Sequence, residues 1–399
     1  MEKLDAWATD ARNCPSDHHP IALQGLPTRP LSRTLIPGTD YCVMPLVFPM
    51  PPLAPLTAHV LAITFAGAYV GSIYLSKHAR LAGRPRDDPA VIKARLRAVA
   101  LATLACCAAI VAVLAALVPA HTPHVSPPPS PGNSALTTTG TQRTAAILDT
   151  ARVRLGLTLA HLRPAHFLLT PLLFLGPLSA RALAAPSYTA LYADAAALAR
   201  EAGGTWVGAR NLLVAPLTEE AVFRACVLAA YQLAGLGRGA GVGASPLAFG
   251  LAHVHHAWEV WTRYGRTPAA ARRAAISSTV QLAYTTAFGA YTALLFLRTG
   301  SLLPPLAAHA WCNALGLPSL AGDLAAVTPP EFHPTRTLPR TLKTRVKRGT
   351  VRVCYVVGLL GFVFALRGWG EAWLGVGEGE ESLYWARFVR RREGTVVFY

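Results

Sequence analysis

The chain has 399 residues, of which 52% are hydrophobic and 14% are charged, and its formal net charge is +17. A soluble globular domain carries about 25% charged residues, so this composition argues against a soluble enzyme and for a surface that faces lipid. The basic residues lie in short loops beside apolar stretches, a distribution typical of a membrane protein and not of a nucleic-acid-binding one.

Residues 1–54 are rich in proline and polar residues and predict a loosely ordered arm. After this arm, residues 55–367 predict an all-α membrane domain, a bundle of about eight transmembrane helices that each approach the ~20 residues needed to cross a bilayer. Residues 368–399 form a predicted C-terminal tail. The expected spans, in chain order, are 56–75, 99–118, 157–178, 206–233, 245–260, 276–297, 302–317 and 351–366.

The three most basic loops follow the first, fifth and seventh of these spans. Loops after odd-numbered spans share one side of the membrane, so the three agree with one another. The preference of basic loops for the cytosol places them there and both termini in the lumen.

Three groups of ionisable or polar residues lie within the apolar segments, where such side chains are costly and are usually functional. The first group is Glu219, Glu220 and Arg224. On a helix, Glu220 and Arg224 are four residues apart and can pair, whereas Glu219 points about 100° away. One carboxylate can therefore be neutralised while the other acts as a general base; a purely structural salt-bridge cluster is the alternative.

The second group is the sequence from Phe249 to His256. Phe249 and His253 share one helical face, His256 lies near that face, and His255 points roughly opposite. Several histidines so close together in an apolar segment favour a functional role over a single buried polar residue.

The third group is His309 and Asn313, which are also four residues apart and project together. An imidazole and an amide can both donate hydrogen bonds, so the pair suits an oxyanion hole. Hydrogen bonding between helices of the bundle is the alternative. Taken together, the three groups supply a carboxylate, an imidazole and two donors, a minimal set for hydrolysing an amide with activated water.

These motifs resemble those of a known family, the type II CAAX prenyl endopeptidases. Glu219-Glu220-Ala221-Val222-Phe223-Arg224 is similar to the family's E-E-x-x-x-R motif. The segments Phe249-x-x-x-His253 and His309-x-x-x-Asn313 are similar to its other two motifs, in the same order. The resemblance is clearest over residues 205–318, and the residues around the first motif are similar to those of the eukaryotic enzymes.

The resemblance implies an endopeptidase that removes the last three residues of proteins ending in Cys-a-a-X once the cysteine is prenylated, with Ras-like GTPases among its substrates. It implies a multi-pass protein of the endoplasmic reticulum membrane, in contact with lipid, whose active site is reached from the cytosolic side. It also implies roles for individual residues. The implied catalytic residues are Glu219, His253, His309 and Asn313, and the implied supporting residues are Glu220, Arg224 and Phe249.

No cofactor is expected on this reading, but three other readings stay open. A zinc-dependent protease could use His253, His256, His309 and a glutamate as ligands, although H-E-x-x-H is missing from the sequence. A thiol mechanism could use Cys226, seven residues after Glu219. A non-catalytic membrane scaffold or transporter could use the same buried charges to relay protons or to hold helices together.

Overall fold

The structure is a computed structural model. It describes residues 50–75, 87–117, 138–159, 162–328 and 340–368, together with a few short stretches outside these ranges. The predicted N-terminal arm and C-terminal tail lie almost wholly outside the described residues. Two antiparallel strand pairs are present there, β1 (Thr34–Leu35) with β2 (Cys42–Val43) and β3 (Val389–Arg392) with β4 (Thr395–Phe398).

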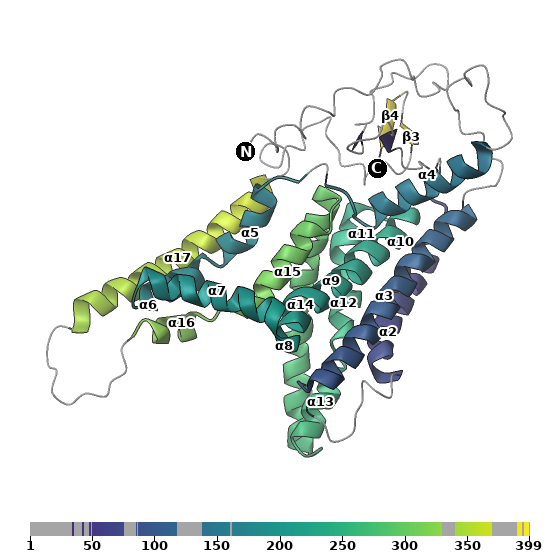
Figure 1. The fold of residues 1–399 in the computed structure, drawn as a ribbon. Coiled ribbons are helices and arrows are strands. Elements are labelled where there is room, and N and C mark those ends of the chain that lie inside the picture. The colour runs from purple at the N-terminus through teal and green to yellow at the C-terminus, as the bar shows by residue number, and fades with distance from the viewer. Residues whose placement is uncertain are drawn as a thin grey trace.

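The membrane domain is helical, as predicted (Figure 1). Within the described residues, 4 helices are long and apolar enough to cross a membrane, or 5 if a bent pair counts as one span. They are α2 (Pro55–Leu75), α3 (Pro89–Leu117), α14 (Pro268–Thr299) and α17 (Arg340–Gly368), with α5 (Ala165–Leu173) and α6 (Leu175–Ala184) as the bent pair. The predicted count of about eight is therefore not confirmed.

The bend of 66° between α5 and α6 follows from the prolines of this segment. Pro171 lies inside α5 and Pro177 inside α6, and a proline within a helix removes one backbone hydrogen bond and clashes with the preceding turn. The third predicted span, residues 157–178, is accordingly broken at this bend.

The fourth predicted span is a chain of short helical segments that follow one another without a gap. In order they are α8 (Trp206–Gly208), η3 (Ala209–Val214), α9 (Ala215–Glu220), η4 (Ala221–Cys226) and α10 (Val227–Leu233), where η3 and η4 are π-helical. Residues 221–234 are all buried, and the segments pack against α2, α3, α12 and α15. Residues 221–234 are thus enclosed by protein, whereas Trp206, Leu213 and Leu217, nearer the start of the stretch, are exposed.

The fifth and seventh predicted spans are also shorter than a bilayer is thick. The fifth breaks at a turn between α12 and α13, and the seventh is a helix of 13 residues. The fifth span corresponds to α12 (Ser245–Ala252) and α13 (His256–Arg263), and the seventh to α15 (Leu303–Leu315). A short helix, α11 (Arg238–Gly243), precedes α12. The remaining helices are α4 (Thr138–Arg154), α7 (Tyr188–Gly204) and α16 (Leu320–Ala326).

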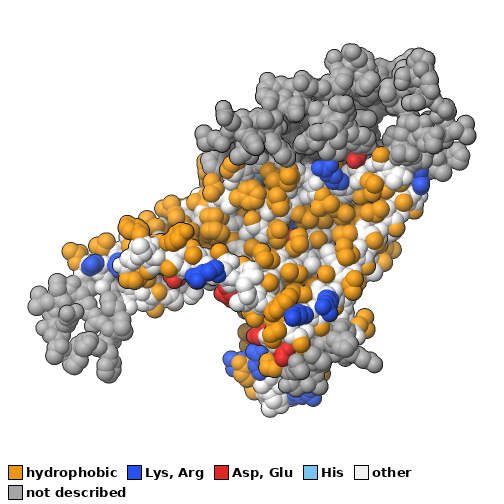
Figure 2. All heavy atoms as spheres, viewed as in Figure 1, with side chains coloured by type: hydrophobic (Ala, Val, Ile, Leu, Met, Phe, Trp, Pro, Cys, Tyr) orange, Lys and Arg blue, Asp and Glu red, His pale blue; other side chains and the backbone are white. Residues whose placement is uncertain are grey.

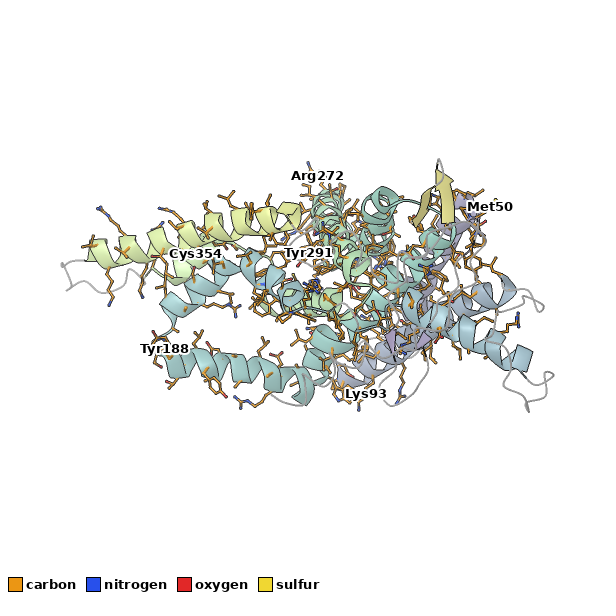
Figure 3. The ribbon with its side chains drawn as sticks, turned by 90° about the horizontal axis from the view of Figure 1, so that it is seen from above. Met50, Lys93, Tyr188, Arg272, Tyr291 and Cys354 are labelled. Atoms are coloured by element: carbon orange, nitrogen blue, oxygen red, sulfur yellow. The ribbon has the colours of Figure 1, made fainter. Side chains whose placement is uncertain are left out.

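The helices form a bundle and a lateral extension that contains α7 and α17. Figure 3 shows Tyr188, at the start of α7, and Cys354, in α17, on one side of the molecule and away from α2 and α3. Tyr291 of α14 joins the two parts, because its hydroxyl lies 2.8 Å from the Thr170 hydroxyl of α5 and its ring lies 5.2 Å from that of Phe362 in α17.

The basic loops attach to one end of the bundle. In Figure 1 the end of α2, the start of α3, α13 and the start of α14 lie together at the lower end, whereas α4 and α11 lie at the other. Figure 2 shows hydrophobic side chains spread across the face between these ends, and Lys and Arg side chains gathered toward the lower one. The two basic loops that border α3 and α14 thus share a side, as their sequence indicated.

The close approach of α17 to α5 depends on Gly358. A Cβ atom there would lie 2.6 Å from the Leu172 carbonyl oxygen, whereas a Cβ at Gly349 of the same helix would meet nothing within 4 Å. Gly358→Ala should therefore destabilise the protein by about 1–3 kcal/mol through overpacking. The control Gly349→Ala should stabilise it by roughly 0.5–1 kcal/mol. Thermal unfolding in detergent micelles measures both, and equal melting temperatures would refute this packing.

Candidate active site

Glu219 and Glu220 end α9, which lies between the two π-helical segments η3 and η4. Pro216, near the start of α9, has no N–H to donate to the carbonyl of Leu212, so the regular hydrogen-bond ladder is interrupted there. π-helical turns often occur at functional sites. Glu219 is 19% exposed whereas Glu220 is fully buried, so the two neighbouring carboxylates face different surroundings.

The predicted ion pair between Glu220 and Arg224 is confirmed. Arg224 Nε lies 3.0 Å from Glu220 Oε2, and the same group donates to Thr292 Oγ1 at 2.7 Å. The Nη atoms of Arg224 have no hydrogen-bond partner among the described residues. Instead, the guanidinium lies 4.2 Å from the centre of the Phe249 ring and 5.8 Å from that of Phe288, where a cation–π interaction stabilises its charge.

His309 lies between the two glutamates. Its Nδ1 is 2.7 Å from Glu220 Oε1 and donates to this carboxyl oxygen, while its Nε2 is 3.8 Å from Glu219 Oε2. A carboxylate that holds one ring nitrogen fixes the orientation and the tautomer of an imidazole. Of the two ring nitrogens, only Nε2 is therefore left to face a substrate. Glu220 thus belongs to the network that orients His309, as well as to the ion pair.

His253 follows the last residue of α12, in the turn before α13. Its Nδ1 donates to the Phe249 carbonyl at 2.8 Å, and its ring lies 4.7 Å from that of Phe249. The shared face predicted for these two residues is thus present. The hydrogen bond leaves Nε2 of His253 available, and the side chain interacts electrostatically with both Glu219 and His309. The structure therefore gathers Glu219, His253 and His309 around one site.

Asn313 lies one turn beyond His309 on α15, at an exposed position. Its Nδ2 donates to the backbone carbonyl of Asn211 in η3 at 2.8 Å. The Asn211 side chain in turn accepts from Arg210 Nε at 2.8 Å. The amide of Asn313 is thus anchored beside the segment that carries the glutamates, and its role as an oxyanion donor stays a prediction.

Thr292 and Asn211 have roles here that the sequence did not indicate. Thr292 lies in α14, within a stretch whose sequence looks like an ordinary apolar span, and its hydroxyl also bonds the carbonyl one turn back. Its bond to Arg224 joins residues 68 positions apart. Thr292 is one of several threonines in α14, and such residues usually bond their own backbone, so nothing in the sequence singled it out.

The zinc ligands considered for the alternative mechanism do not come together as a set. Among the described residues, three or more possible ligands gather within 4.8 Å of one another at His255, His256 and Glu259 alone. His255 lies in the turn between α12 and α13, outside the candidate membrane spans. Burial lowers its pKa to about 4, so this imidazole is neutral at pH 7.

Comparison with known proteins matches the part of the chain that carries these residues. Residues 201–315 match the model of the family described as type II CAAX prenyl endopeptidase Rce1-like. The chain is 34% identical to the human CAAX prenyl protease 2 over 278 residues, which cover 68% of this chain and 73% of the human protein. It is 37% identical over 161 residues to the probable CAAX prenyl protease 2 of Schizosaccharomyces pombe, covering 40% of this chain.

The coverage differs among these relatives. The chain spans 51% of the length of the fission-yeast protein. It is also 36% identical over 157 residues to the CAAX prenyl protease 2 of Arabidopsis thaliana, of which it covers 42%. No solved structure matches the chain.

Proposed function

Because this chain belongs to the type II CAAX prenyl endopeptidase family, we propose that it removes the C-terminal aaX tripeptide from prenylated Cys-a-a-X proteins within the membrane. One observation carries the proposal. The partly exposed carboxylate of Glu219 lies 3.8 Å from His309 Nε2. The other ring nitrogen of His309, Nδ1, is held by the buried Glu220. A base beside an oriented imidazole is the arrangement that activated-water hydrolysis requires.

In the proposed reaction Glu219 takes a proton from a water molecule as the water oxygen attacks the scissile carbonyl carbon. The electron pair of the carbonyl moves onto its oxygen. Asn313 donates to this oxyanion from Nδ2, and His309 supplies the second donor when its Nε2 carries a proton. His253 then relays to the leaving amine the proton that Glu219 took from water, while the oxyanion re-forms the carbonyl and the C–N bond breaks. The products are a prenylcysteine carboxylate and a free tripeptide.

The membrane would supply part of the substrate affinity. A prenyl chain that lies in the bilayer or between helices gains ~0.8 kcal/mol for each buried CH₂. We place the enzyme in the endoplasmic reticulum membrane, with prenylated proteins such as Ras-like GTPases reaching the site from the cytosol. The basic side chains at one end of the bundle would attract anionic lipid on that side.

The test uses the purified full chain in nanodiscs and two peptides of one sequence, farnesylated and unmodified at the Cys-a-a-X cysteine. Mass spectrometry of the products should show the intact tripeptide released from the farnesylated peptide alone. A scaffold or transporter would release none. Cleavage of both peptides at equal rates, or at another bond, would also overturn the proposal.

A thiol mechanism makes a different prediction from the one proposed. Cys226 is fully buried in η4, with its Sγ 3.7 Å from Cys107 Sγ of α3, so it is closed off from any substrate. Cys226→Ala should therefore keep tripeptide release within a few fold of the wild-type rate. A loss comparable with removal of a general base, about 10²-fold or more, in a variant that still melts cooperatively would restore the thiol reading.

A further inference from the structure

A second cluster, of side chains that could bind a metal ion, lies immediately after His253. The possible ligand atoms of His255, His256 and Glu259 all lie within 4.8 Å of one another. His255 belongs to the turn after α12, and the other two belong to the first turn of α13. None of the three has a role in the proposed hydrolysis, so the cluster needs its own explanation.

The two imidazoles are arranged as metal ligands usually are. His255 Nδ1 donates to the Ala252 carbonyl at 2.6 Å, which leaves the lone pair of its Nε2 free. A backbone carbonyl that holds the other ring nitrogen is the common support of a ligating histidine. The ring centres of His255 and His256 are 4.0 Å apart, close enough for the two imidazoles to share one ion.

Glu259 completes the set. Its Oε2 lies 3.2 Å from His256 Nδ1, and the two side chains are 31% and 25% exposed. The cluster is therefore shielded on one side and open to solvent on the other. An ion that entered from solvent would meet a carboxylate and two imidazoles without a large rearrangement of the turn.

We propose that His255, His256 and Glu259 bind one divalent ion of the zinc class and leave a fourth position to water. Two nitrogen ligands and one carboxylate favour zinc over magnesium or calcium, which prefer oxygen ligands alone. The site joins the end of α12 to the first turn of α13, so a bound ion holds the turn that carries His253. It is separate from Glu219 and His309, and it does not depend on the chain being a protease.

The test titrates Zn²⁺ into the full chain, purified without a histidine tag and stripped of metal, in detergent. Wild type should bind one ion, and His256→Gln and Glu259→Gln should each weaken binding at least about tenfold, because even groups that only support ligands contribute 10–100-fold. Two control variants, His59→Gln and Glu219→Gln, should bind as wild type does. His59 bonds Tyr231 in another part of the bundle.

A second readout on the same samples is amide hydrogen exchange across residues 253–259, measured without substrate. Zinc should slow this exchange in wild type and leave it unchanged in Glu259→Gln. Three results would overturn the site: no stoichiometric zinc in wild type, binding that survives both ligand substitutions, or binding that is lost in Glu219→Gln. The last result would place the ion at the candidate active site. Because none of these readouts is proteolysis, a failed peptide assay leaves this test intact.

Discussion

Replacing Glu219 with glutamine is expected to lower the rate of tripeptide release by about 10²–10⁴-fold, the contribution of a well-placed general base. Glutamine keeps the shape of the side chain but cannot take a proton from water. Glu219 is 19% exposed, and its 3.8 Å contact with His309 Nε2 is longer than a hydrogen bond. The substitution should therefore leave folding nearly unchanged while it removes the chemistry.

The matched control for Glu219→Gln is Glu201→Gln on α7, which changes an exposed glutamate outside the site in the same way. Initial rates on the farnesylated peptide are compared per folded molecule, with melting temperatures recorded alongside. Glu201→Gln should cleave as wild type does. A folded Glu219→Gln that cleaves at the wild-type rate would remove Glu219 from the mechanism.

Glu220→Gln should instead destabilise the protein, by about 3–5 kcal/mol in the free energy of unfolding. Glu220 is fully buried, pairs with Arg224 at 3.0 Å and accepts from His309 at 2.7 Å. Its removal leaves the guanidinium of Arg224 as an uncompensated charge in the core. Glutamine has nearly the same volume, so the loss measures charge and not a cavity.

A double variant separates these contributions. Arg224→Met together with Glu220→Gln removes both charges, and replacing a buried pair with neutral groups often restores stability. We expect the double variant to melt above Glu220→Gln in nanodiscs. Both should release less tripeptide, because the neutral amide oxygen of glutamine holds the Nδ1–H of His309 more weakly than a carboxylate does. A Glu220→Gln protein as stable as wild type would show that the buried network contributes little to folding.

The sequence was sufficient for those features that depend on local spacing. The Glu220–Arg224 pair and the contact of Phe249 with His253 both join residues four apart on a helix, and both are present. The long spans α2, α3, α14 and α17 could be predicted because ~20 apolar residues are needed to cross a bilayer.

The middle of the chain could not be predicted in this way. An apolar stretch reads alike whether lipid or protein covers it, so the sequence could not show that protein encloses residues 221–234. The hydrogen bond between Glu220 and His309 joins residues 89 positions apart, and helical spacing carries no information on such a contact. His309 and Asn313 read as two free donors, whereas the fold gives one nitrogen of His309 to Glu220.

The most direct test of water activation by Glu219 is a single turnover in ¹⁸O-labelled water, with enzyme in excess over the farnesylated peptide. If water itself attacks the scissile carbonyl, the new prenylcysteine carboxylate carries the heavy oxygen in the first turnover. If Glu219 attacks instead and forms an anhydride that water opens at the enzyme's carbonyl, the first product is unlabelled and the label is found in Glu219. We predict a labelled product, and an unlabelled product with labelled enzyme would contradict the account.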